Sequence, residues 1–342
     1  MKKADIGVAL YLLAAVIFFI VPISSNLLDV MLALNISIAL IVLFNTLFVK
    51  EVLDMSFFPT LLLFTTIFRI SLNVSSTRLI LTTGNPGNVV QTFGQFVGGG
   101  DLIVGAIVFI ILVIIQFVVN KGSERVAEVT ARFTLDAMPG KQMAIDADLN
   151  TGAITEKQAR ERRNKIQEES AFFGSMDGAT KYVKGDAAAG LIITFVNLAG
   201  GTIMGILRGG MTFQEAIEHY GVLTIGDGLS SQIPSLLISL ATGILVTKAS
   251  KEADFSNILV SQLFGIPKVL YIVGTTLAVL GIATPLNTLL FLAFGATFII
   301  AGRQVDKNIG IESIEEEVNA EETEAEEVRK PENVVSLLQV DP

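Results

Sequence analysis

Residues 101–120 read DLIVGAIVFIILVIIQFVVN, and this stretch decides the fold class. No charged residue follows Asp101 in it, and its length falls within the roughly 17 to 25 residues that a helix needs to cross the apolar core of a bilayer. A run that is apolar on every side has no polar face to turn toward water. The stretch therefore predicts a transmembrane helix.

Further apolar runs of this length recur on both sides of it. Together they predict eight transmembrane helices, at 5–22, 27–49, 57–82, 101–120, 187–207, 232–248, 266–283 and 286–302. The composition agrees, because 51% of the 342 residues are hydrophobic and only 17% are charged, against about a quarter in soluble proteins. The expected fold is an all-α polytopic membrane protein with about eight transmembrane helices.

Lysine and arginine residues gather on one side of the expected membrane. The segment 121–186 holds eleven of them, whereas the loops around 22–26, 83–100 and 284–285 hold none. Because basic loops stay in the cytoplasm, this pattern predicts a small, mainly helical cytoplasmic insert between the fourth and fifth helices, with both termini cytoplasmic. The expected organisation is four transmembrane helices in 1–120, the insert in 121–186, four more helices in 187–307 and an acidic cytoplasmic linker in 308–342.

Several classes of function are not indicated by the sequence. The chain has no cysteine and one histidine, His219, so neither a thiolate nor a multi-histidine metal site is expected. It shows no Walker-type phosphate loop and no nucleophile–base pair, so we expect no enzyme. Eleven acidic and two basic residues in 308–342 account for the whole net charge of −9, so nucleic-acid binding is not expected either. We expect a further cytoplasmic domain to follow this linker.

The insert is expected to begin with a helix that continues from residues 101–120. Arg125 and Arg132 are seven residues apart and share one face of it, and Asp136 lies within ion-pair reach of Arg132. Pro139-Gly140 is expected to end this helix. The alternative to a functional role for the three charged residues is a surface ion pair worth about 0 to 1 kcal/mol.

A second insert helix is expected after a turn at residues 150–152. Thr155 and Gln158 have the spacing of a capping box, which predicts its start. A basic cluster follows, formed by Arg160, Arg162, Arg163 and Lys165. We interpret this cluster as a solvated helix face near anionic lipid headgroups, with docking of a partner as the alternative.

Residues 181–197, KYVKGDAAAGLIITFVN, place a carboxylate where the fifth apolar run begins. Asp186 is either the N-cap of a helix that starts at residue 187 or a group that takes up and releases protons. In the second interpretation Lys181 and Lys184 favour its charged form, while the nearby hydrocarbon disfavours it.

Three more charged residues lie in or beside apolar runs. Asp227, in LTIGDGLSSQIPS, indicates either an ion site in an interrupted helix or a turn in a solvated loop. Arg69 is near the middle of the third run, so we expect it to face the bundle interior and to pair with another group there. Arg78 is expected to reach toward the far interface.

Four stretches resemble a known family when they are read together. They are NVSSTRLILTTG, RFTLDAMPGKQMAIDAD, FGSMDGATKYVKGDAAAG and LTIGDGLSSQIPSLLIS, and they are similar to the FHIPEP family, the large export-gate proteins of type III secretion and of the flagellum. The similarity is dense from Phe57 to Lys248, and LLQVDP at the end looks more like the flagellar branch.

The resemblance implies a homo-oligomeric, nine-fold ring in the bacterial inner membrane that works with the gate proteins FlhB, FliP, FliQ and FliR. It implies an export ATPase complex and chaperone–substrate complexes as partners of the further C-terminal domain, and membrane lipids around the ring. It implies no bound cofactor, with protons as the coupling ion and sodium as a possible one. Asp186 matches the family's proton-responsive aspartate, and Arg125, Arg132 and Asp136 match positions linked to gating.

Two other functions remain open at this stage. The chain could be a proton or sodium channel or transporter in its own right, acting through Asp227 and Asp186. It could instead be a passive ring scaffold that only positions a soluble docking domain. The leading hypothesis is an export-gate subunit that couples the proton motive force to the export of unfolded flagellar proteins.

Overall fold

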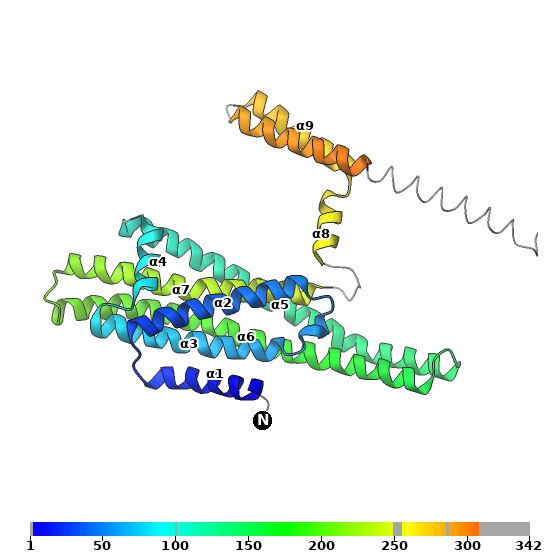
Figure 1. The fold of residues 1–342 in the computed structure, drawn as a ribbon, viewed down its shortest axis with the longest axis horizontal. Helices are drawn as coiled ribbons and strands as arrows, with labels where there is room; N and C mark the ends of the chain where they lie inside the picture. The colour runs from blue at the N-terminus through cyan, green and yellow to red at the C-terminus, as the bar shows by residue number, and fades with distance from the viewer. Residues whose placement is uncertain (1–2, 100, 249–254, 285–286, 308–342) are drawn as a thin grey trace, which may run out of the picture. The chain divides into compact units, whose positions relative to one another are not determined.

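The computed structural model describes residues 3–99, 101–248, 255–284 and 287–307, and these residues form helices joined by short connections, with no β-strand among them. The helices are α1 (Lys3–Ile20), α2 (Ser25–Phe48), the 3₁₀ helix η1 (Val52–Met55), α3 (Phe58–Thr83), α4 (Asn88–Gly98), α5 (Leu102–Asn150), α6 (Glu156–Leu207), α7 (Phe213–Thr247), α8 (Phe255–Phe264), α9 (Pro267–Ala283) and a last helix at Thr288–Lys307. Figure 1 shows their arrangement.

Six of these helical segments are long and apolar enough to cross a membrane: α2, η1 with α3, α5, α6, α7 and Thr288–Lys307. The protein is therefore an all-α polytopic membrane protein, as its apolar runs predict. The first and seventh expected spans correspond to shorter apolar helices, Ala9–Ile20 and α9. A membrane crossing by these two stays a prediction.

The chain divides into two compact units, Met1–Glu252 and Ala253–Pro342. In the first unit α3, α5, α6 and α7 pack against one another, α2 lies on α7, and α1 lies on α3. In the second unit α9 packs against Thr288–Lys307, so closely that a methyl group on Gly274 would lie 2.7 Å from the carbonyl oxygen of Gly295. The acidic linker predicted at 308–342 lies outside the described residues.

α5 and α6 form a long helical hairpin that contains the insert (Figure 1). The break predicted at Pro139-Gly140 is wrong, because α5 continues through both residues to Asn150. A proline inside a helix costs about 3 kcal/mol, and ion pairs to α6 offset part of this cost, among them Lys141 with Glu169 at 2.8 Å. The turn predicted after residue 150 is present.

The start of α6 follows the prediction, but the expected break before the fifth span is absent. Thr155 and Gln158 form the expected capping box, and Gly152 in the turn has φ of 74°, which glycine adopts without strain. α6 then runs 52 residues without a break. At about 1.5 Å per residue it is roughly 78 Å long, against about 30 Å for the bilayer core. The insert and the fifth span therefore share one rigid helix.

The N-cap interpretation of Asp186 is consequently wrong. An N-cap residue has an extended backbone, whereas Asp186 lies well inside α6, far from the N-cap at Thr155. Three alanines follow Asp186, and alanine has the highest helix propensity, so local sequence favours continuation of the helix. The side chain is thus free to point sideways into the bundle.

α7 begins at Phe213, although its span was predicted to start at residue 232. Asp227 therefore lies within a continuous helix, and both the turn and the interrupted-helix interpretations of it are wrong. Glycines flank Asp227 because neighbouring helices approach α7 closely there. A methyl group on Gly226 would lie 1.8 Å from the carbonyl oxygen of Val90 in α4. Residues that look like a loop serve close packing instead. α4 itself lies in the segment 83–100, which was expected to be a loop.

Candidate functional site

A buried ion pair joins α3 to α6. Arg69 Nη2 lies 2.5 Å from Asp186 Oδ2, and the two residues are only 1% and 5% exposed. Charges at such depth persist when they are paired, because the loss of hydration is offset by mutual attraction. The pairing expected for Arg69 is confirmed, and Asp186 is the partner that the sequence did not identify.

The sequence of α3 explains why a cation fits here. Thr66, Arg69, Asn73 and Ser76 follow at intervals of three and four residues, so they share one face of the helix. All four are buried. α3 thus presents a polar stripe inside the bundle, although it is apolar enough overall to cross a membrane.

The second carboxylate, Asp227 of α7, is 3% exposed. Its Oδ2 accepts a hydrogen bond of 2.7 Å from Asn197 Nδ2 of α6, which is fully buried. Asn197 lies eleven residues after Asp186, about three helical turns, so both point to the same side of α6. Asn197 was not predicted as a site residue, although it is the single side-chain amide within the apolar run 187–207 and could have been recognised by that.

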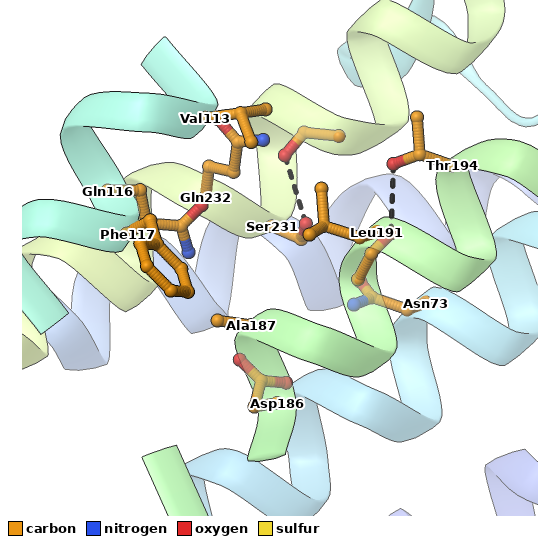
Figure 2. A pocket seen from close by; sticks show the side chains of 12 residues that line it. Asn73, Val113, Gln116, Phe117, Asp186, Ala187, Leu191, Thr194, Ser231 and Gln232 are labelled. Carbon is orange, nitrogen blue, oxygen red and sulfur yellow. Dashed lines mark hydrogen bonds between the residues drawn. The ribbon is translucent and has the colours of Figure 1, made fainter. Parts of the chain in front are cut away.

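A small pocket opens beside Asp186, between α3, α5, α6 and α7. Its volume is about 30 Å³, enough for about one water molecule. Figure 2 shows the polar side chains that come together there from the four helices. They are Asn73 from α3, Gln116 from α5, Asp186 and Thr194 from α6, and Ser231 and Gln232 from α7.

The lysines expected to tune Asp186 bind other carboxylates. Lys181 Nζ lies 3.0 Å from Asp177 Oδ2, and Lys184 Nζ lies 3.3 Å from Glu124 Oε1. Both lysines are exposed and belong to the part of α6 that precedes the expected span. The hydrogen bond to Asp177 raises the pKa of Lys181 above its usual value. Arg69 is therefore the cation that contacts Asp186, and neither lysine does.

The charged residues of the first insert helix also pair differently from the prediction. Arg125 and Arg132 both bind Glu128, at 2.9 and 3.5 Å, and Arg132 does not pair with Asp136. The shared face of the two arginines is confirmed, because one carboxylate between them reaches both. These residues are solvent-exposed, so the geometry alone assigns them only the small stability of surface ion pairs.

Most of the basic cluster holds the insert together. Arg162 binds Asp148 at 2.9 Å and Arg163 binds Asp146 at 2.5 Å, which joins α6 to α5. Lys165 binds Glu51 at 2.9 Å, just before η1, and this contact raises the pKa of Lys165. Three of the four basic side chains therefore face acidic partners within the chain, which weakens the expectation of a lipid-facing cluster.

Arg78 is an anchor for α1 and does not simply reach toward the interface. Its Nη1 donates to the carbonyl of Ile20 and its Nη2 to the carbonyl of Phe19, at 3.0 and 2.9 Å. These carbonyls end α1, where a positive charge is favourable because the helix dipole is negative there.

Comparison with known proteins agrees with this architecture. The FHIPEP family model matches residues 15–342. The chain is 50% identical to the flagellar biosynthesis protein FlhA of Bacillus subtilis over its whole length, and 48% identical over 82% of its length to FlhA of Salmonella typhimurium. Over 85% of its length it is 48% identical to the low calcium response locus protein D of Yersinia pestis.

These alignments cover 51%, 41% and 42% of the three relatives, so the chain spans about half the length of the curated proteins it matches. No solved structure matches the chain. The family model and the relatives together show that this chain belongs to the FHIPEP family.

Proposed function

We propose that this chain is the membrane part of an export-gate subunit of the flagellar type III secretion apparatus, in the bacterial inner membrane. Its membership of the FHIPEP family, its similarity to proteins named flagellar biosynthesis protein and its polytopic fold support this proposal. The subunit couples the inward flow of protons to the export of unfolded flagellar proteins. It acts as a switch in a transport machine and not as an enzyme.

The ion pair between Arg69 and Asp186 is the observation on which the proposal rests. When Asp186 takes up a proton, Arg69 remains as a buried cation without a counter-charge. Breaking a buried pair in this way costs about 3–5 kcal/mol, which is enough to drive a rearrangement between two helices. Protonation of Asp186 therefore changes the packing of α6 on α3.

The continuous course of α6 gives this local change a long reach. Asp186 and the whole second half of the insert, from Glu156 onward, lie on the same helix. A tilt or shift of α6 at Asp186 moves the insert as a rigid arm, and the ion pairs of Arg162 and Arg163 carry α5 with it. Arg125, Arg132 and Asp136 lie on α5, the other helix of this hairpin, where gating contacts are proposed.

Asp227 supplies a second proton-binding group. Asn197 connects it to α6, so both carboxylates act on the same helix. This arrangement also favours the second candidate function, in which each protomer conducts protons or sodium ions past Asp186 and Asp227. Proton flux through liposomes that contain the purified full-length protein alone separates the two, because an export gate couples flux to its partners while a channel conducts without them.

The partners follow from the proposed function. We propose that protomers of this chain form a homo-oligomeric, nine-fold ring, which is surrounded by lipid and works with FlhB, FliP, FliQ and FliR. The domain that follows residues 308–342 in longer relatives is proposed to receive the export ATPase complex and chaperone–substrate complexes. The basic insert is proposed to face the cytoplasm, together with both termini.

The experiment uses full-length protein in cells that lack the native copy, with secretion and ring assembly measured in parallel. Asp186→Asn keeps the shape of the side chain but removes proton uptake, and Asp186→Glu keeps proton uptake with a longer side chain. The proposal predicts assembled rings without export for the asparagine variant, and partial export for the glutamate variant. Normal export by Asp186→Asn would overturn it.

A further inference from the structure

The pocket beside Asp186 contains polar oxygens that the protein leaves without hydrogen-bond donors. Asp186 uses Oδ2 for Arg69, while its Oδ1 is buried and makes no hydrogen bond to any described residue. Oε1 of Gln232 is also buried and has no donor among the residues that the structure describes. Both residues line the same pocket. Buried oxygens of this kind are costly unless something donates to them.

We propose that this pocket holds one water molecule, which donates one hydrogen to Asp186 Oδ1 and the other to Gln232 Oε1, and that protons reach Asp186 through this water. The inference rests on the proposed function of Asp186 as a proton switch. It adds the route by which the proton arrives, and it makes Gln232 a positioning residue for that water.

The size and the chemistry of the pocket fit a single water. A volume of about 30 Å³ exceeds the minimum for one ordered water, and such a water needs two to four polar partners. A water molecule has two hydrogens for the two free oxygens, and two lone pairs that remain available. The side-chain amides of Asn73 and Gln116 also line the pocket and carry N–H donors. One lone pair of the water accepts from such an amide, and the other accepts the incoming proton while the water passes one of its own hydrogens to Asp186 Oδ1.

The hydroxyl groups in the pocket are already committed to their own helices. Thr194 donates to the carbonyl of Gly190 and Ser231 donates to the carbonyl of Gly228, each at 2.9 Å (Figure 2). Their hydrogens are therefore used, so they compete weakly with water for Asp186. Neither hydroxyl is therefore the donor to Asp186 Oδ1, and the proposal assigns that role to the water.

Few charged groups lie near Asp186, so an incoming proton has few alternative acceptors. The charged group of α3 that contacts Asp186 is Arg69. The residues of α5 and α7 that line the pocket carry only amide, hydroxyl or apolar side chains or are glycine, and Asp227 of α7 is not among them. Asp186 is thus the one titratable group among the twelve lining residues. A proton that enters this pocket has a single acceptor in reach.

The pocket also has an entrance. Phe117 of α5 and Leu191 of α6 line it and are 54% and 48% exposed, so they form its outer edge. In this proposal, water enters the pocket between these two side chains.

Gly190 offers a way to fill the space without a clash. It lies four residues after Asp186 and four before Thr194, on the same face of α6, and a methyl group there meets no atom within 4 Å. Gly190→Ala thus adds a methyl group to the lining of the pocket, and alanine favours a helix by about 1 kcal/mol relative to glycine. Gly185→Ala is the matched control, because this exposed residue of α6 also has open space around it and does not line the pocket.

The test compares export, ring assembly and the rate at which Asp186 becomes protonated. It uses four full-length variants, which are Gly190→Ala, Gln232→Met, Gly185→Ala and Asp186→Asn. That rate is followed by the infrared band of the protonated carboxyl after a rapid fall in pH, identified by its absence in Asp186→Asn. We expect Gly190→Ala and Gln232→Met to slow protonation and export severalfold while rings still form, and Gly185→Ala to match the parent.

The outcomes separate this inference from the proposed function. If Asp186→Asn loses export while Gly190→Ala and Gln232→Met are protonated and export at the parent rate, the water route is wrong and the switch stands. If Asp186→Asn exports normally, the proposed function fails first. If either pocket variant fails to assemble, the other decides the question, because one adds a methyl group to the lining and the other replaces an amide with an apolar group of similar length.

Discussion

Arg69 and Asp186 are 117 positions apart in the sequence and form an ion pair of 2.5 Å within the helical bundle. Each is the only opposite charge that the other contacts among the described residues. The pair sits where α3 and α6 pack, and α6 continues from it into the insert. The charge state of one carboxylate is therefore linked to the position of a helix about 78 Å long.

Loss of the arginine should weaken the fold strongly. Arg69→Gln leaves the Asp186 carboxylate buried without its counter-charge, which we expect to lower the free energy of unfolding by about 3–5 kcal/mol. Denaturant unfolding of the purified protein in detergent measures this loss. Arg78→Gln is the comparison, because it removes only contacts to backbone carbonyls at the end of α1, and we expect a loss of about 1–3 kcal/mol. Equal losses for the two variants would contradict the special role of the buried pair.

Asn197 should matter for stability although it carries no charge. Asn197→Leu removes the donor to Asp227 Oδ2 inside the bundle, and an unsatisfied buried acceptor costs about 1–3 kcal/mol. The same measurement on Asn45→Leu serves as a control, since Asn45 is exposed on α2. A loss no greater than that of the control would show that Asp227 does not depend on Asn197.

The rigidity of α6 between the insert and Asp186 can be tested at Tyr182. This residue is 61% exposed, so its replacement disturbs no core contact. Tyr182→Pro removes a backbone hydrogen bond and kinks the helix, at a cost of about 3 kcal/mol. We expect export to be lost while rings form, and Tyr182→Ala to export normally. Normal export by the proline variant would mean that the insert does not act as a rigid arm.

The ion pair between Lys165 and Glu51 predicts a pH dependence of stability. The pKa of Lys165 is raised in the folded protein, chiefly by its hydrogen bond to Glu51, so the pair stabilises the fold below the usual lysine value of 10.5 as long as the Glu51 carboxylate is charged. That contribution is lost as the pH rises through the raised pKa. Thermal unfolding of the parent and of Glu51→Gln should therefore differ slightly at neutral pH and converge once the pH exceeds the raised pKa of Lys165. A difference that persists in strong alkali would assign the effect to packing.

The membrane class could be predicted from the sequence because it depends on composition within single segments. Runs such as 101–120 have no polar face, and no neighbour is needed to interpret them. The capping box at Thr155 and Gln158 was equally predictable, since all of its partners lie within one turn. Local features of this kind depend only on residues that are close together in the sequence.

The continuity of α5, α6 and α7 and the partner of Arg69 could not be predicted, for a different physical reason. Pro139, Asp186 and Gly226 each look like an interruption when only their neighbours in sequence are considered. Contacts with other helices decide otherwise, as when α4 packs directly on Gly226 or Arg69 neutralises Asp186. One sequence does not state which residues of distant helices meet, so the ion pair and the pocket required the structure.

The central claim is that Asp186 works by taking up a proton and not merely by balancing Arg69. The measurement that tests it most directly is export by full-length protein that carries Asp186→Asn and Arg69→Gln together, with ring assembly as the control. The double variant has no buried charge at this site, so its fold should regain the stability that each single variant loses, and its rings should form. We predict that export nevertheless stays absent. Export restored to the parent level would contradict the account and reduce the ion pair to a structural contact.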